Sequence, residues 1–189
     1  MHYPLPEISG PEASVIQTIL DASAEVATFL RHSPIIVLES TNKFGDTQLQ
    51  QDVHADDIIE KHLRKNPLIK GFASEERPQL EEFNGEGYGY YVTFDPLDGS
   101  SIVVNNFTVG SIFAVWPRTE KKLIGEKIGA QVNAVISLFG PRTTALFYNG
   151  PIDKVQELTF IDNKWILSHE HLVIKGKTNI YAPGNLRAS

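Results

Sequence analysis

This 189-residue chain lacks several features that define well-known classes of protein. It contains no cysteine, which excludes disulfides, thiolate metal sites and a cysteine nucleophile within it. No stretch approaches the ~20 consecutive apolar residues that a membrane-spanning helix needs. Basic residues are also in deficit, with 17 Lys and Arg against 23 Asp and Glu, so the formal net charge is −6. That balance argues against a nucleic-acid scaffold, which carries a basic surplus on one face.

What the chain does contain is enough apolar sequence to build a core. Hydrophobic residues make up 41% of it and aromatic residues 10%, which is typical of a globular protein. The N-terminal segment carries Glu7, Glu12, Asp21 and Glu25, unlike a secretory signal or an Arg-rich transit peptide. We therefore expect a cytoplasmic protein that binds neither nucleic acid nor a membrane.

The hydrophobic pattern predicts two helices followed by many strands. The first helix begins after a capping-box sequence at residues 9–12 and covers Val15 to Leu30. The second carries Leu49, Val53, Ile59 and Leu63 and ends near Asn66-Pro67. Short runs rich in Ile, Val, Phe and Tyr then predict strands at Ile69–Ala73, Tyr90–Phe94, Val109–Trp116, Val132–Leu138, Thr144–Tyr148, Gln156–Ile161 and Trp165–Ser168. This order favours α+β layers over alternating βαβ units.

Acidic residues cluster where two of the predicted strands end. Glu75 and Glu76 follow the first strand, and Asp95 and Asp98 follow the second. The proline at position 96 fixes the backbone after Asp95, so the two aspartates and the Leu97 carbonyl can converge on one hard cation. Such an all-oxygen site suits Mg²⁺, with Mn²⁺ as the alternative.

A candidate phosphate site comes directly after these acids. Gly99 lets the backbone approach a ligand, and the successive amides of Gly99, Ser100 and Ser101 can form an anion nest. A surface turn is the simpler interpretation, because Asp, Pro, Gly and Ser all favour turns. Two further acids, Asp46 and Asp52, give a third acidic element and favour the metal interpretation, although alone they are typical of a solvated helix.

Taken in order, these motifs resemble the class I fructose-1,6-bisphosphatase family, and the resemblance covers roughly Ile16 to Ala188. It rests on Gly45-Asp46-Thr47-Gln48, Asp52, Ser74-Glu75-Glu76, the run from Phe94 to Ser101, and Val109-Gly110-Ser111-Ile112-Phe113. Within the family the chain is most similar to the sedoheptulose-1,7-bisphosphatase branch. That likeness rests on Ile102, where fructose bisphosphatases usually have Asn, and on Val115-Trp116-Pro117, residues 139–144 and residues 183–188.

The resemblance implies a fold and a domain arrangement. N-terminal helices would pack on a large mixed, mostly antiparallel sheet, as in the N-terminal half of the sugar phosphatase fold. Residues 1–189 would form the N-terminal metal-binding domain of a bisphosphatase, with its C-terminal sugar-binding domain absent from this chain. A homodimer or homotetramer is expected.

The resemblance also implies roles for residues. The catalytic divalent metals would be held by Glu75, Asp95, the Leu97 carbonyl and Asp98, and Asp46 would reach a further, more loosely held metal. The attacking water would be oriented and deprotonated by Asp52 and Glu76, and the phosphate held by the amides of Gly99, Ser100 and Ser101. Weaker candidates for substrate contacts are Asn185 and Arg187.

The implied reaction is hydrolysis of the C1 phosphate of sedoheptulose 1,7-bisphosphate. Fructose 1,6-bisphosphate is the alternative substrate, and an inositol-phosphatase-like enzyme is disfavoured by Ser100-Ser101, where those enzymes usually have Thr after the Gly. A non-catalytic metal-binding fragment is the competing interpretation from another class. A plastid or a glycosome is the alternative to the cytoplasm.

Overall fold

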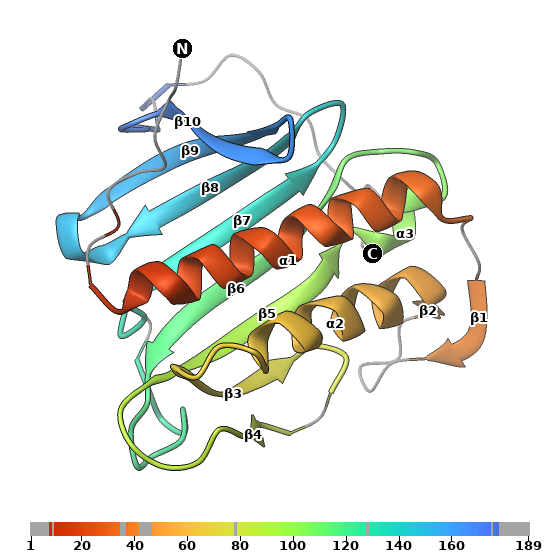
Figure 1. The fold of residues 1–189 in the computed structure, drawn as a ribbon. Coiled ribbons are helices and arrows are strands. Elements are labelled where there is room, and N and C mark those ends of the chain that lie inside the picture. The colour runs from red at the N-terminus through yellow and green to blue at the C-terminus, as the bar shows by residue number, and fades with distance from the viewer. Residues whose placement is uncertain are drawn as a thin grey trace.

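The computed structural model describes residues 8, 10–34, 37–41, 47–77, 79–127, 129–174 and 176–177. Two helices, α1 (Glu12–His32) and α2 (Gln50–Leu63), lie side by side on one face of an eight-stranded sheet (Figure 1). A short helix, α3 (Ser100–Val103), and a 3₁₀ turn, η1 (Gly150–Ile152), complete the helical elements that the structure describes. No helix in the described part of the chain is long and apolar enough to cross a membrane.

The large sheet is mixed but mostly antiparallel, as predicted. Its spatial order is β10 (Lys164–His169), β9 (Lys154–Ile161), β8 (Thr143–Asn149), β7 (Asn133–Phe139), β6 (Val109–Pro117), β5 (Tyr90–Asp98), β3 (Ile69–Ser74) and β4 (Glu81–Glu82). Strands β5 to β10 pair antiparallel in chain order, whereas β3 runs parallel to β5. A separate antiparallel pair joins β1 (Val37–Thr41) to β2 (Thr47–Leu49).

Helix α1 covers the middle of the sheet because its apolar residues recur at helical spacing. Its buried face includes Val15, Ile19 and Val26, as the periodicity predicts. The start of the helix differs from the predicted capping box. Pro11 occupies the N-cap position without a side-chain hydrogen bond, and the Glu12 carboxylate instead accepts the Tyr90 hydroxyl at 2.6 Å. Ser9 lies outside the described residues.

The two faces of the sheet differ sharply in exposure. Side chains alternate across a strand, so Phe113 and Val135 point toward the helices and are buried, while their neighbours point the other way. On that other face, Ile112 and Ile136 are each 40% exposed. We call this surface the open face of the sheet.

Trp165 fastens β10 to helix α1, and its replacement gives a test of the fold. Its indole N–H donates to the Leu20 carbonyl at 3.0 Å in a buried position. Trp165→Phe is expected to lower the free energy of unfolding by about 2 kcal/mol, from the lost hydrogen bond and the smaller ring. Urea unfolding followed by circular dichroism measures this change.

The chain offers a matched control in its other tryptophan. Trp116 donates its indole N–H to Thr93 Oγ1 at 2.9 Å, but the ring is only half-buried. Trp116→Phe is expected to have the smaller effect, because less apolar contact is lost with the ring. Equal losses from the two variants would contradict the buried anchoring role of Trp165.

Candidate active site

Glu75 and Asp95 lie beside each other because β3 and β5 are parallel neighbours. Ser74 of β3 and Phe94 of β5 are partners in the register, and Glu75 and Asp95 are the next residues on the two chains. The Glu75 amide donates to the Phe94 carbonyl at 3.1 Å, which carries the pairing one residue past β3. A pocket of about 340 Å³ opens at this point, and both carboxylates line it.

The pKa of Asp95 is shifted by burial and by the carboxylates around it. Burial raises its pKa to about 7, helped by the charge of Glu75, by a hydrogen bond between these two side chains and by the charge of Asp98. A hydrogen bond from the Leu97 amide to Asp95 Oδ1, at 3.0 Å, acts in the opposite direction. A buried carboxyl group that keeps its proton beside other acidic groups forms a site where a cation can replace that proton.

The pattern predicted that this strand ends at Phe94, before the acidic segment. Strand β5 instead continues to Asp98. A bulge lies between Asp95, which pairs with Ile112, and Asp98, which pairs with Gly110. The surface-turn interpretation is therefore wrong for residues 95–98. The Leu97 side chain is buried in the core, so only its backbone can face a ligand.

The predicted phosphate-binding residues form a tight turn into α3. Gly99 has φ +86°, a left-handed conformation that favours glycine, and its carbonyl accepts the Ile102 amide at 3.0 Å. A left-handed residue followed by right-handed ones is the arrangement of an anion nest. Asp98, Gly99 and Ser101 line a pocket of about 320 Å³ that shares Ile112 with the pocket at Asp95, so the two hollows adjoin.

Helix α2 meets the acidic turn through a residue that the sequence analysis did not single out. Asp56 is 3% exposed and accepts the Ser74 hydroxyl at 2.5 Å. Burial raises the pKa of Asp56, while Ser74 and Arg77 oppose that rise. Asp52, which is 4% exposed, lies one helical turn earlier on α2, about 6 Å along the axis. Four-residue spacing places both acids on one helix face.

A sequence signal for Asp56 did exist. It falls among Ala55, Ile59 and Leu63, the positions where α2 buries its apolar face. An acid at such a position has to be paired inside the protein, because burying an unpaired carboxylate is costly.

Other predicted site residues are not brought together by the described structure. Asp46, Asn185 and Arg187 lie outside the described residues. Glu76 stands in the turn after β3, where its amide donates to Ser74 Oγ at 3.2 Å. Across the part of the chain that the structure describes, no three His, Cys, Asp or Glu side chains form a group that could hold a metal ion. The described centre is thus the Glu75–Asp95 pair with Asp98 nearby.

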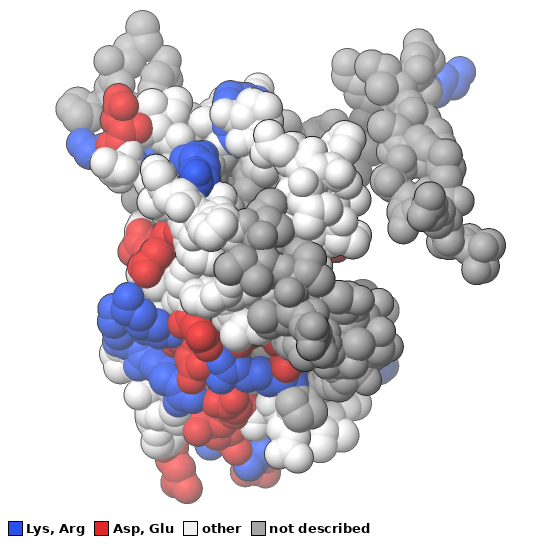
Figure 2. Space-filling model, turned by 90° about the vertical axis from the view of Figure 1, so that its right-hand side faces the viewer, with Lys and Arg blue, Asp and Glu red and all other residues white. Residues whose placement is uncertain are grey.

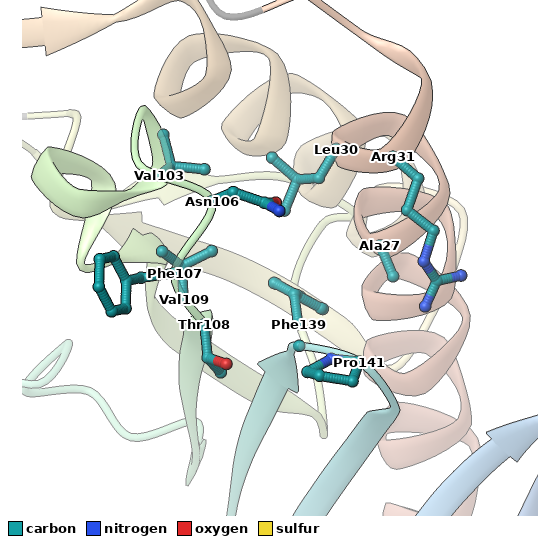
Figure 3. Close-up of a pocket in the computed structure, with 11 residues that line it drawn as sticks. Ala27, Leu30, Arg31, Val103, Asn106, Phe107, Thr108, Val109, Phe139 and Pro141 are labelled. Atoms are coloured by element: carbon teal, nitrogen blue, oxygen red, sulfur yellow. The ribbon is translucent and has the colours of Figure 1, made fainter.

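A separate hollow lies on the helix side of the sheet, near the end of α1. Its volume is about 270 Å³, and Figure 3 shows it between α1, the segment after α3 and the end of β7. Leu30, Val103 and Phe139 contribute apolar side chains, and Arg31 turns its guanidinium to Thr143 Oγ1. Among the described residues that line this hollow there is no acidic side chain.

Comparison with known proteins shows which family the chain resembles in sequence. The family model described as "Fructose-1-6-bisphosphatase, N-terminal domain" matches residues 15–170. The chain is 38% identical to a chloroplastic sedoheptulose-1,7-bisphosphatase of Triticum aestivum, over 95% of this chain and 46% of that protein. It is 35% identical to a class 1 fructose-1,6-bisphosphatase of Geobacter metallireducens, over 92% of this chain and 54% of that protein.

The fold is also similar to that of a solved fructose-1,6-bisphosphatase. The crystal structure of Leishmania major fructose-1,6-bisphosphatase in holo form superposes with a TM-score of 0.79 at 25% identity, covering 89% of this chain and 58% of that one. The chain therefore spans about half the length of the curated relatives it matches.

Proposed function

The chain belongs to the fructose-1,6-bisphosphatase family, and from that premise we propose that the protein is a metal-dependent phosphatase acting on the C1 phosphate of sedoheptulose 1,7-bisphosphate. The single observation that carries the proposal is the pairing of Ser74 with Phe94, which brings Glu75 and Asp95 to the lining of one pocket. The adjoining turn at Gly99 supplies backbone amides for an anion.

By residue type the proposed donors suit a hard divalent cation, and the set includes Asp46, which lies outside the described residues. Carboxylate oxygens of Glu75, Asp95 and Asp98, with the Leu97 carbonyl, are the ligands that Mg²⁺ prefers, and Asp46 is proposed as a further ligand. Mn²⁺ accepts the same donors. The chemistry that such a cation supplies when bound is a more acidic water molecule and neutralised charge on the phosphoryl oxygens.

The remaining roles fall to the chain's own groups. We assign Asp52 and Glu76 to orienting the attacking water and accepting its proton, which general-base catalysis requires. The amides of Gly99, Ser100 and Ser101 would bind the transferred phosphoryl group and stabilise its charge in the transition state. Asn185 and Arg187 are kept as candidates for contacts to the substrate.

The domain assignment is part of the same proposal. Residues 1–189 would be the metal-binding domain, and a second domain would recognise the sugar. The apolar open face, with Ile112 and Ile136 exposed beside both pockets, supports a surface that packs against further protein. A homodimer or homotetramer, in the cytoplasm, remains our expectation.

One assay separates the candidate functions. Phosphate release with Mg²⁺ would be measured on sedoheptulose 1,7-bisphosphate, fructose 1,6-bisphosphate and inositol monophosphate. Preference for the first substrate supports the proposal, whose sequence support is Ile102 and Val115-Trp116-Pro117. Preference for the second favours the fructose enzyme, and equal rates on all three contradict a sugar bisphosphatase. No release with any substrate favours a non-catalytic metal-binding fragment.

A further inference from the structure

The turn that carries Glu75 and Glu76 is tied to helix α2 through a buried serine. Ser74 Oγ donates to Asp56 Oδ1 at 2.5 Å and accepts the Glu76 amide at 3.2 Å. Both Ser74 and Asp56 are buried, so these hydrogen bonds form away from water, where they are stronger. The backbone of Glu76 is thus linked by one hydroxyl to a carboxylate on α2.

Arg77 closes the same turn from its other end. Its amide donates to the Ser74 carbonyl at 3.2 Å, and its Nε donates to Asp56 Oδ2 at 2.6 Å. The guanidinium also pairs with Glu60 on α2 at 2.5 Å and with Glu81 on β4 at 3.0 Å. Asp56 therefore binds both ends of the turn, one with each of its carboxylate oxygens.

Figure 2 shows acidic and basic side chains interleaved over the lower part of one side of the molecule, and Arg77 with its carboxylate partners is an ionic cluster of this mixed kind. The Arg77 guanidinium is 5.3 Å from the centroid of the Phe72 ring, and its side chain is only 22% exposed. An arginine held by several carboxylates and an aromatic ring has little freedom to move.

We infer that Asp56, Ser74 and Arg77 form a positioning cluster that sets Glu75 beside Asp95, an inference that rests on the proposed function. The three residues hold the turn at Ser74, Glu76 and Arg77, and Glu75 is enclosed between these fixed points. Asp56 also lies one helical turn from Asp52 on α2, so the position of this helix relative to the turn affects where Asp52 lies relative to Glu75.

The inference is tested by Mn²⁺ binding to the chain, titrated alone by electron paramagnetic resonance. Ser74→Ala and Asp56→Asn are expected to raise the Kd for Mn²⁺ by about 10- to 100-fold, as loss of groups that orient metal ligands does. Ser74→Thr keeps the hydroxyl and should bind Mn²⁺ much as the parent does. Circular dichroism checks that each variant is folded.

A matched control removes a buried serine hydroxyl elsewhere. Ser137 Oγ donates to Ser23 Oγ at 2.8 Å between β7 and α1, and Ser137→Ala should leave the Kd unchanged. An unchanged Kd in Ser74→Ala, or an equal rise in Ser137→Ala, would overturn the inference. Phosphate release is measured in parallel. If the parent releases phosphate but its Kd for Mn²⁺ equals that of Ser74→Ala, the proposed function stands and the cluster fails. If the Kd values differ but the parent releases no phosphate, the cluster stands and the proposed function fails.

Discussion

Replacing Asp95 with asparagine is expected to reduce phosphate release by about 10³-fold at saturating Mg²⁺. Cation-assisted catalysis supplies several kcal/mol of transition-state stabilisation, and about 4 kcal/mol corresponds to a factor of 10³. Asparagine keeps the size of the side chain but removes the charge that a cation requires. Glu75→Gln removes the other half of the pair and should have a similar effect. Steady-state rates of phosphate release measure both.

The double variant gives the sharper result. Glu75 and Asp95 act on one ion in the proposed mechanism, so Glu75→Gln/Asp95→Asn should lose little more than either single change. Asp162→Asn is the matched control, because Asp162 lies exposed in the β9–β10 turn with φ +50°, a conformation that asparagine tolerates. A shared site would be contradicted if the double variant lost activity by the product of the two single losses, or if Asp162→Asn lost as much activity as Asp95→Asn.

The second large effect is on stability and depends on pH. The pKa of Asp95 in the folded chain is raised to about 7, well above that of an unfolded aspartate. Between these two pKa values Asp95 binds more protons in the folded state than in the unfolded state, so it contributes a fall in the stability of the cation-free chain as pH rises from about 4 to about 7. The pKa of Asp56 is raised as well, so Asp95→Asn should remove the part of the fall that Asp95 contributes and leave the part from Asp56.

A divalent cation should reverse the loss. Cation at about 100 times its Kd stabilises a folded state by about 2.7 kcal/mol, which is roughly 5–10 °C in Tm for a chain of this size. The gain should be larger at about pH 8 than at about pH 5, because at low pH the proton on Asp95 has to leave first. Thermal unfolding with MgCl₂ or EDTA at both pH values measures it. Equal gains at the two pH values, or a full gain in Asp95→Asn, would disprove the linkage.

Much of the fold could be predicted because its elements follow strong local rules. Helix α1 and strands β5 to β9 carry clear apolar periods bounded by Gly, Pro and Asn, and each appears close to its predicted place. Strand β4, by contrast, consists of Glu81 and Glu82, which have little strand propensity. It forms because Gly71 and Phe72 of β3 offer it backbone hydrogen bonds, a long-range effect.

The candidate site was predictable in part for a similar reason. Glu75 and Asp95 could be proposed from their positions after strands, yet nothing local in the sequence specifies that β3 pairs parallel to β5. The contact of Asp56 with Ser74 depends on how α2 docks on the sheet, which is a tertiary result. The acids that define the chemistry were thus visible in the sequence, whereas the groups that hold them in place were not.

The single parallel pairing in the described sheet has a consequence for the chain between the two acids. A parallel pair cannot be closed by a tight hairpin, so residues 75–89 have to cross from the end of β3 back to the start of β5, and they carry β4 on the way. Glu75 opens this connection and Asp95 lies beyond it in β5. We therefore expect a change in the length of the connection to disturb the Glu75–Asp95 pair before it disturbs the antiparallel meander of β5 to β10.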